Sequence, residues 1–221
     1  MASLFRQSQH IFRGHRLPAD FYGDFIIPEP VGRLVRRAKI TDEDGKLVVS
    51  NATPGTEFMR SRDANLRPVN AGTGPHGCLY ICDMYRGIIQ EGNWVRPGSY
   101  LRGVVENYGL DKNIGRGRIY RVVHESTRRG KRPQMLSAPS PELVSHLSHA
   151  NGWWRDTAQR LIVERGDASL LEPLTAVLRT PSKPIGQLHA LWCLEGLGLL
   201  NADHVQVLLQ SGEEHLISSA L

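Results

Sequence analysis

The chain has 221 residues, of which 40% are hydrophobic and 22% are charged, and its formal net charge is +5. This composition excludes wholesale disorder, and no apolar run approaches the roughly 20 residues of a simple transmembrane helix. The positive charge is spread over many arginines, with one dense basic cluster at residues 128–132. It therefore indicates no continuous nucleic-acid-binding surface.

The first predicted elements are short strands that occur in two copies. Residues 23–29 (GDFIIPE) and 77–83 (GCLYICD) each contain a glycine, an apolar strand and an acid at the same offset. A second strand follows each copy, at 32–36 and at 117–121. The first pair of strands is nearly contiguous and predicts a hairpin, whereas residues 84–116 separate the second pair. Repeated short antiparallel strands with glycine-marked turns are typical of propeller blades.

The two copies predict that residues 1–132 are the C-terminal blades, about two in number, of a β-propeller. Two blades alone would expose sheet edges, which folded proteins avoid, so we expect the missing blades to be partners of this segment. Because Glu29 and Asp83 share an offset, we expect them at equivalent ends of adjacent blades, where an acid caps the following turn. The insertion at 84–116 should leave from that end and cover it as an ordered lid or contact surface.

The spacing of apolar residues changes near Pro133, where a strand period gives way to a helical one. Residues 133–139 are rich in proline and serine and predict a linker, after which we expect no strand. Residues 140–221 predict antiparallel helix pairs similar to HEAT-like repeats, beginning with an N-cap at Ser140 and a proline in the first turn. The sequence thus predicts a mixed β-then-α chain, a partial propeller followed by a truncated α-solenoid.

The cysteines and histidines predict no metal site. Cys78 and Cys82 are four residues apart in a predicted strand, which places their Cα atoms ~13 Å apart, beyond the reach of a disulfide. Covalent haem attachment requires Cys-x-x-Cys-His, which this sequence lacks. His146 and His149 share a helix face, but no third ligand stands at a suitable spacing. We therefore expect the cysteines, including Cys193, to be small core residues.

The sequence also resembles a known family. The resemblance is carried by residues 15–37 (HRLPADFYGDFIIPEPVGRLVRR), 58–89 (FMRSRDANLRPVNAGTGPHGCLYICDMYRGII), 154–166 and 188–198. These segments are similar to membrane-bound dehydrogenases described from planctomycetes and their relatives. In that family a glucose/sorbosone dehydrogenase-like β-propeller is followed by HEAT-like repeats and often by a cytochrome c domain. The resemblance implies that this chain is an internal fragment, preceded by most of the propeller and followed by a further domain.

The resemblance implies three candidate cofactor-binding residues. In sugar dehydrogenases, arginines at places comparable to Arg67 face the central pocket, where Arg67 could pair with an anionic quinone such as pyrroloquinoline quinone. The alternative for Arg67 is a salt bridge between blades. Asp83 could position a substrate hydroxyl or a metal, with Arg86 as its ion-pair partner, and the alternative is turn capping. The catalytic histidine of those enzymes belongs to earlier blades, so no catalytic residue is assigned in this chain.

The residues and the resemblance support two functional hypotheses of different kinds, and they support a third less strongly. The leading hypothesis is a fragment of a quinoprotein-like dehydrogenase that oxidises a sugar or alcohol and passes electrons to a haem domain. The fragment alone should be inactive, with pyrroloquinoline quinone and haem c held only by the full-length protein. The alternative is a non-catalytic protein-binding scaffold, in which the propeller and the HEAT-like repeats both serve as binding surfaces. Nucleic-acid binding through the basic cluster is the third, and we do not expect it. The resemblance implies a periplasmic or envelope-associated location.

Overall fold

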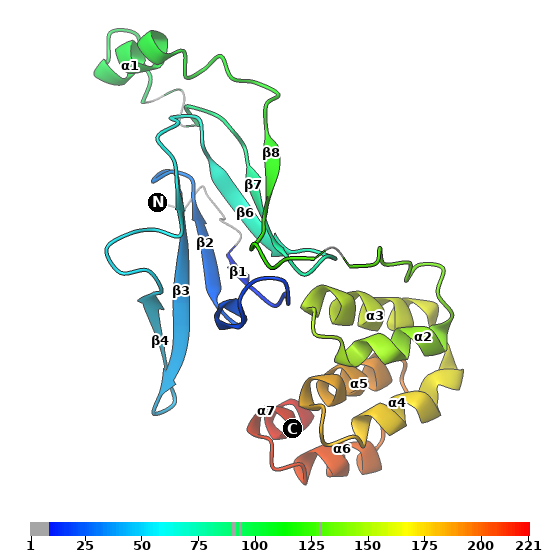
Figure 1. The fold of residues 1–221 in the computed structure, drawn as a ribbon. Coiled ribbons are helices and arrows are strands. Elements are labelled where there is room, and N and C mark those ends of the chain that lie inside the picture. Colours follow the sequence, from blue (N-terminus) through cyan, green and yellow to red (C-terminus); the bar gives the residue numbers. More distant parts are fainter. Residues whose placement is uncertain (1–8, 90–91, 93, 129) are drawn as a thin grey trace. The chain divides into compact units, whose positions relative to one another are not determined.

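A computed structural model of the chain describes residues 9–89, 92, 94–128 and 130–221 (Figure 1). The chain divides into two compact units, Met1–Arg128 and Arg129–Leu221, which we call the β unit and the helical unit. The described strands all lie in the β unit, and residues 130–221 contain none. No helix in the described ranges is both long enough and apolar enough to cross a membrane.

The larger sheet of the β unit is antiparallel and contains five strands. Its strands are β1 (His10–Ile11), β2 (Phe25–Glu29), β3 (Leu34–Glu43), β4 (Lys46–Asn51) and β5 (Met59–Arg60), and the 3₁₀ turn η1 (Ala19–Phe21) precedes β2. Strand β3 is central, because it pairs with β2, with β4 and, at its start, with β5. Pairing of Pro28 with Val35 and of Ile26 with Arg37 puts these four residues on one face of the sheet.

The smaller sheet is also antiparallel and has the order β6-β7-β8. Its strands are β6 (Pro68–Thr73), β7 (Leu79–Asp83) and β8 (Arg118–Val122). The long insertion between β7 and β8 contains α1 (Tyr100–Tyr108), which Ser99 caps and which ends at Gly109 in the left-handed conformation. Apolar residues of the insertion form a small cluster of their own, namely Ile88, Val95, Val105 and Leu110. The described part of the insertion therefore has apolar packing of its own.

The two sheets share one apolar core. Ile26 and Val35 of the larger sheet lie in the same cluster as Leu79 and Ile81 of the smaller one, and all four are fully buried. Phe12, which follows β1, completes the centre of this cluster. The alternation of buried and partly exposed residues along β2 and β7 is what a sheet with one covered face requires.

The predicted propeller is wrong. The β unit has two antiparallel sheets of five and three strands, neither closed nor curled into blades, packed on a common core. The repeated pattern of glycine, apolar strand and acid marks the beginning and end of an antiparallel strand. It does not specify how many partners that strand has. The ten-residue β3 pairs along its length with β2, β4 and β5, so the first copy belongs to a larger sheet than the second.

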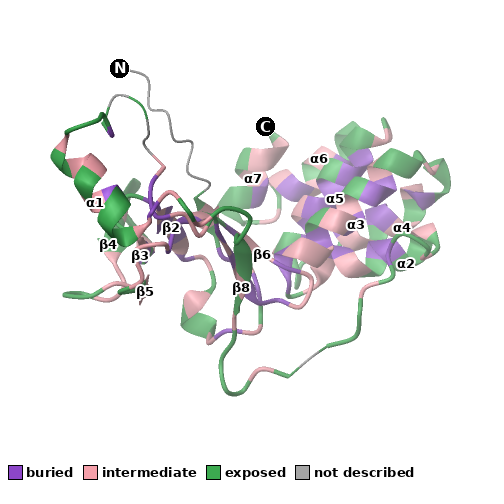
Figure 2. Cartoon of the chain, turned by 90° about the horizontal axis from the view of Figure 1, so that it is seen from above, coloured by how far each residue is buried: buried purple, intermediate pink, exposed green. Residues whose placement is uncertain are grey.

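The helical unit consists of short helices around one core. Its elements are α2 (Ser140–Ser145), η2 (His146–Ser148), α3 (Gly152–Arg165), η3 (Ala168–Leu170), α4 (Leu171–Leu178), α5 (Pro184–Gly196), α6 (Ala202–Leu209) and α7 (Glu214–Ala220). Side chains of Asn151, Asp167 and Asn201 accept backbone hydrogen bonds at the starts of α3, η3 and α6. Figure 2 shows buried residues on the sides of the helices that face one another.

The predicted solenoid is also wrong. The helices pack around one buried helix, α5, which contacts α3, α4 and α7. Helix α5 is buried on most of its sides, including Ala190, Leu191 and Leu194, which is the pattern of a central helix. A single cluster contains Leu143 of α2 and Leu216 of α7. Helical spacing alone predicted the helices but does not distinguish a row of repeats from a bundle around one core.

Candidate functional site

Asp83 is the last residue of β7, and its carboxylate accepts hydrogen bonds from backbone N–H groups. It is 2% exposed, and its Oδ1 accepts hydrogen bonds from Arg67 N at 2.7 Å and from Tyr85 N at 2.8 Å. The Tyr120 hydroxyl donates to Oδ2 at 3.3 Å. Burial and the charge of Asp83 raise the pKa of Tyr120. The predicted capping of the following turn is confirmed for Asp83, because Tyr85 lies in that turn.

Glu29 has the corresponding role at the end of β2. Its Oε1 accepts hydrogen bonds from Val31 N at 2.8 Å and from Gly32 N at 3.3 Å. The side chain of Arg67, whose own N–H binds Asp83, also reaches the turn that follows Glu29. The two acids therefore lie at the same end of their sheets, as their shared offset predicts, although the sheets are not blades. The insertion that carries α1 leaves from this end (Figure 1).

Arg67 is a buried arginine whose side chain, in its described hydrogen bonds, donates only to carbonyl oxygens. It is 5% exposed. Its Nε donates to Arg86 O at 2.8 Å, and its two terminal nitrogens donate to Pro30 O and Gly87 O. The salt bridge considered as its alternative role is absent from the described contacts of Arg67. Because a guanidinium has five N–H donors, these bonds leave two without an acceptor among the described residues.

Arg33 is a second arginine close to Arg67. It is the last residue of the turn between β2 and β3 and has a positive φ of 57°, which is uncommon outside glycine. Its Nε is buried and has no hydrogen-bond partner in the described part of the chain. Burial and the charge of Arg33 together lower the pKa of Arg67 to about 10. We call Arg33 and Arg67 the arginine pair; no described carboxylate pairs with either of them.

The structure brings the three predicted cofactor-binding residues together, but through the backbone. Arg67 contacts the carboxylate of Asp83 with its N–H and the carbonyl of Arg86 with its Nε. Arg86 donates from its own Nε to Ile88 O at 3.2 Å and is not among the described partners of Asp83. Their cofactor role stays a prediction. Arg33 was missed because its sequence pattern predicted that it belongs to a strand. The signal that could have identified it is the short turn between the two strands, whose last residue is Arg33 in the left-handed conformation.

Tyr85 holds the loop that supplies two of these carbonyls. Its φ of 49° is an outlier for an aromatic residue, and such strain persists only where surrounding contacts enforce it. Its hydroxyl donates to Asp63 Oδ2 at 2.8 Å, and the Arg118 guanidinium lies 3.5 Å from its ring centroid. The hydrogen bonds from Asn65 N and the Tyr85 hydroxyl keep the pKa of Asp63 below its ordinary value. These contacts fix the backbone just before Arg86.

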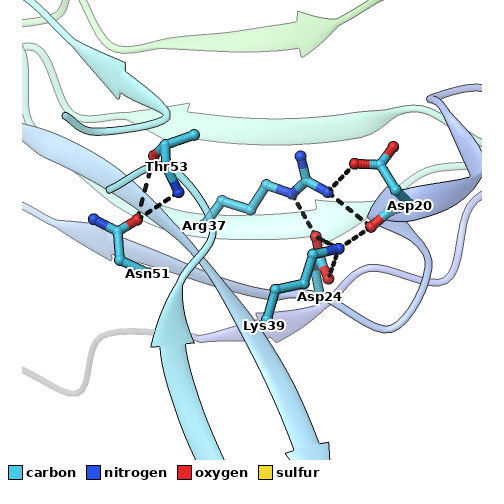
Figure 3. Close-up of polar contacts among 6 residues, drawn as sticks. All are labelled: Asp20, Asp24, Arg37, Lys39, Asn51 and Thr53. Atoms are coloured by element: carbon cyan, nitrogen blue, oxygen red, sulfur yellow. Dashed lines mark hydrogen bonds and ion pairs between the residues drawn. The ribbon is translucent and has the colours of Figure 1, made fainter. Parts of the chain in front are cut away.

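A second buried arginine in the β unit has a different environment (Figure 3). Arg37 is 7% exposed, donates from Nε to Asp24 Oδ2, and donates from a terminal nitrogen to Asp20 Oδ2 at 2.7 Å. Lys39 Nζ lies 2.8 Å from Asp24 Oδ1, and the Arg37 guanidinium lies 3.5 Å from the Phe21 ring centroid. We call Asp20, Asp24, Arg37 and Lys39 the Arg37 network. Its two acids balance its two bases.

A comparison with protein families matches residues 6–126 to the family described as Domain of unknown function (DUF7133), which is more than half of the chain. The chain belongs to this family. The matched residues include the arginine pair, Asp83 and the Arg37 network, whereas the helical unit lies beyond them. No curated protein and no solved structure matched the chain.

The arginine pair gives this DUF7133 domain a candidate site for the recognition of charge. In the described ranges, no group of three or more His, Cys, Asp or Glu residues could hold a metal ion. Cys78 is buried and Cys82 is partly buried, and burial raises the pKa of Cys78. In the helical unit, burial raises the pKa of Cys193 to about 12, which keeps it a neutral thiol. The arginine pair is therefore the strongest candidate site, and its positive charge favours an anionic ligand.

Proposed function

We propose that this chain is part of a dehydrogenase-like protein, to which its DUF7133 domain contributes a binding site for a carboxylated quinone. The observation that carries the proposal is the arginine pair. Arg67 is buried, its pKa is lowered by burial and by Arg33, and no carboxylate among the described residues pairs with either arginine. Two neighbouring cations without a counter-charge favour the binding of an anion.

The carbonyl contacts of Arg67 satisfy hydrogen bonds without neutralising its charge. Pro30 O, Arg86 O and Gly87 O each present a partial negative charge. A buried ion that lacks a counter-ion costs several kcal/mol of desolvation, and a nearby like charge adds to that cost. An anion in contact with the two remaining donors of Arg67 and with Arg33 Nε would balance both charges. Hydrogen bonds between a guanidinium and a carboxylate are among the strongest in proteins.

Pyrroloquinoline quinone is the cofactor that the dehydrogenase resemblance implies, and its carboxylates suit this site. The buried Nε of Arg33, which has no partner in the described chain, is the specific observation that fits such a group. When bound, a quinone of this kind accepts the two electrons of an alcohol oxidation. The residues of this chain would bind and orient it: Arg33 and Arg67 by charge, Asp83 by holding Arg67 in place. We propose that the catalytic base and the haem domain belong to other parts of the dehydrogenase-like protein, so that this chain alone is inactive.

The second candidate function is a non-catalytic protein-binding module. A specific observation in the helical unit favours it, because a groove of about 660 Å³ lies between residues 132–137 and helix α3. The two candidates concern different units and do not exclude each other. A periplasmic or envelope-associated location stays a prediction of the dehydrogenase resemblance.

The test is direct binding of pyrroloquinoline quinone to the full chain by isothermal titration calorimetry. The informative variant is Arg33→Asn, because asparagine tolerates the left-handed conformation while the substitution removes the guanidinium with its charge and its N–H donors. We expect this variant to bind the quinone at least tenfold more weakly than the wild type. Arg62→Asn is the matched control, since Arg62 is an exposed arginine of the same unit, and it should leave the affinity unchanged.

Two results would reject the proposal. One is the absence of quinone binding to the wild-type chain at millimolar concentration. The other is equal affinity of the wild type and Arg33→Asn. A parallel titration with citrate separates the quinone from carboxylates in general, because the proposal requires pyrroloquinoline quinone to bind more tightly than citrate. Binding that falls equally in Arg33→Asn and Arg62→Asn would show non-specific charge attraction and would also count against the site.

A further inference from the structure

The groove of the helical unit combines an apolar floor with basic edges. Met135, Leu136, Trp153 and Leu161 supply its apolar part, and its remaining lining residues are Arg132, Pro133, Gln134, Ser137, Thr157 and Arg160. Its volume of about 660 Å³ is in the range of sites that enclose a small ligand or a few side chains of a peptide. It lies wholly within the helical unit, outside the matched DUF7133 residues.

One wall of the groove is a single face of α3. Trp153, Thr157, Arg160 and Leu161 follow the spacing of residues that lie on one side of a helix. Leu161 is buried in the core of the unit, while Trp153 is partly exposed and packs against that core. The wall therefore presents a large aromatic side chain on a rigid element.

The other wall is an irregular segment that α3 itself holds in place. Terminal nitrogens of Arg165 donate to Ala138 O at 2.7 Å, to Leu136 O at 3.0 Å and to Met135 O at 3.1 Å. Met135 is 4% exposed and anchors the segment in the core. Next to it, Leu136 is 84% exposed. The segment is thus fixed at its backbone while presenting one large apolar side chain to solvent, at the edge of a groove.

The charge of the groove has one sign. Arg132 and Arg160 line it, and none of the described lining residues is acidic. Arg160 contacts Glu164 at 3.4 Å, but both side chains are more than half exposed, and such a surface pair contributes little. An occupant that complements this surface carries carboxylates on either side of a large apolar side chain.

We propose that this groove binds an acidic peptide segment of a partner protein, with a leucine or phenylalanine seated between Leu136 and Trp153. The inference rests on the protein-binding function proposed for the helical unit and specifies its ligand. An apolar anchor with complementary charges around it is the usual arrangement at the centre of a protein interface. Nucleic acid fits less well, because its recognition needs a longer basic track than two arginines. A second copy also fits less well, since each copy carries a net charge of +5.

The test uses fluorescein-labelled peptides and the full chain, with binding followed by fluorescence anisotropy. The probe is Glu-Glu-Leu-Phe-Glu-Glu, and the comparison peptides are Lys-Lys-Leu-Phe-Lys-Lys and Glu-Glu-Ser-Ser-Glu-Glu. We expect the acidic apolar probe to bind at least tenfold more tightly than either comparison peptide. The double variant Arg132→Gln, Arg160→Gln and the single variant Leu136→Ser should each weaken binding of the probe at least tenfold. Arg179→Gln, at an exposed arginine of the same unit outside the groove, should not.

Several results would overturn the inference. These are no preference for the acidic apolar probe, unchanged affinity in the double variant, and tighter binding of a single-stranded oligonucleotide than of the probe. Self-association of the wild type that Leu136→Ser abolishes, seen by analytical ultracentrifugation, would assign the groove to a second copy instead. None of these outcomes depends on the quinone titration, because Arg33 and Arg67 lie in the β unit and the groove variants lie in the helical unit.

Discussion

Arg37 and Arg67 are both buried arginines of the β unit, but the protein compensates their charges in different ways. Arg37 meets two carboxylates, Asp20 and Asp24, and lies against the ring of Phe21. The side chain of Arg67 donates only to carbonyl oxygens in its described contacts, and Arg67 has another arginine as its charged neighbour. The first arrangement is complete within the described chain. In the second arrangement, three carbonyl oxygens accept hydrogen bonds from the Arg67 side chain, but no carboxylate among the described residues balances its positive charge.

The difference follows from where each arginine lies. Arg37 lies within the paired strand β3, next to η1, where Asp20 supplies acceptors from both its backbone and its side chain. Arg67 lies just before β6, at the strand ends, where turns and the insertion present carbonyl groups. Within the sheet, the charge of Arg37 is balanced by carboxylates of the chain itself. An arginine without a counter-ion at the strand ends is where a ligand or a partner chain can bind.

The largest effect should come from breaking the Arg37 network. Asp24→Asn removes the charge of a carboxylate that is 3% exposed and leaves Arg37 buried with only the largely exposed Asp20 as its acid. Removing one partner of a buried ion pair costs about 3–5 kcal/mol of stability. We expect a loss of about 3 kcal/mol in the hydrogen-exchange protection of the β3 amides.

Hydrogen exchange is the appropriate measurement because the chain has two compact units, whereas a single two-state transition is expected only of single domains. Asp44→Asn, at an exposed turn residue, is the control and should change protection by less than about 0.5 kcal/mol. A loss below about 1 kcal/mol in Asp24→Asn would mean that the network does not stabilise the sheet, and the contrast between the two arginines would fail.

Replacing Arg67 should have a smaller effect on stability, because the loss of hydrogen bonds and the removal of a buried charge act in opposite directions. Arg67→Met leaves Pro30 O, Arg86 O and Gly87 O without their donor, and each unsatisfied buried acceptor costs about 1–3 kcal/mol. The same change removes an uncompensated buried charge, which offsets part of that cost. We expect a net loss of about 1–3 kcal/mol in protection of the β6 and β7 amides without any anion present.

Arg33→Asn sharpens this prediction. It removes the repulsive charge without removing any described hydrogen bond, so β6 and β7 should keep or slightly gain protection. If both variants lost protection equally, Arg33 would be a structural brace and the argument for an anion would disappear. If Arg67→Met lost none, its carbonyl contacts would contribute no stability.

The sequence predicted the local structure better than the assembly. Glycine-marked strands predicted β2 and β7, and the shared offset of Glu29 and Asp83 correctly placed both acids at the same end. The change of period near Pro133 predicted that helices follow the strands. These signals are local, because strand and helix periods depend on residues close in the sequence. The choice between blades and two sheets on one core depends on contacts between distant strands, which the pattern does not specify.

The candidate site shows the same limit. Arg67 and Asp83 were predicted to matter, but the sequence could not show that Arg67 binds Asp83 through its backbone N–H and distant carbonyls through its side chain. Arg33 was missed because its importance depends on a turn conformation and on its nearness to a residue more than thirty positions away. The Arg37 network was missed for a related reason, since alternation alone gave no indication that a basic residue of β3 faces the core.

The smallest expected effect is the acid dependence of the Arg37 network. The hydrogen bond from Arg37 lowers the pKa of Asp20 in the folded protein below its ordinary value of 3.8. A carboxyl group whose pKa is depressed by folding stabilises the protein above its unfolded value and loses that contribution as pH falls through the folded value. The protection that Asp20→Asn removes from the β3 amides should therefore be present at pH 6 and vanish at pH values well below 3.8. Because the Asp20 side chain is 63% exposed, the effect should be small and should shrink further in high salt.

The loss caused by Arg67→Met should not vary between the same pH values, since no described carboxylate pairs with the Arg67 side chain. Equal acid dependence in the two variants would show that Arg67 has an acidic partner after all, and the two arginines would then be alike.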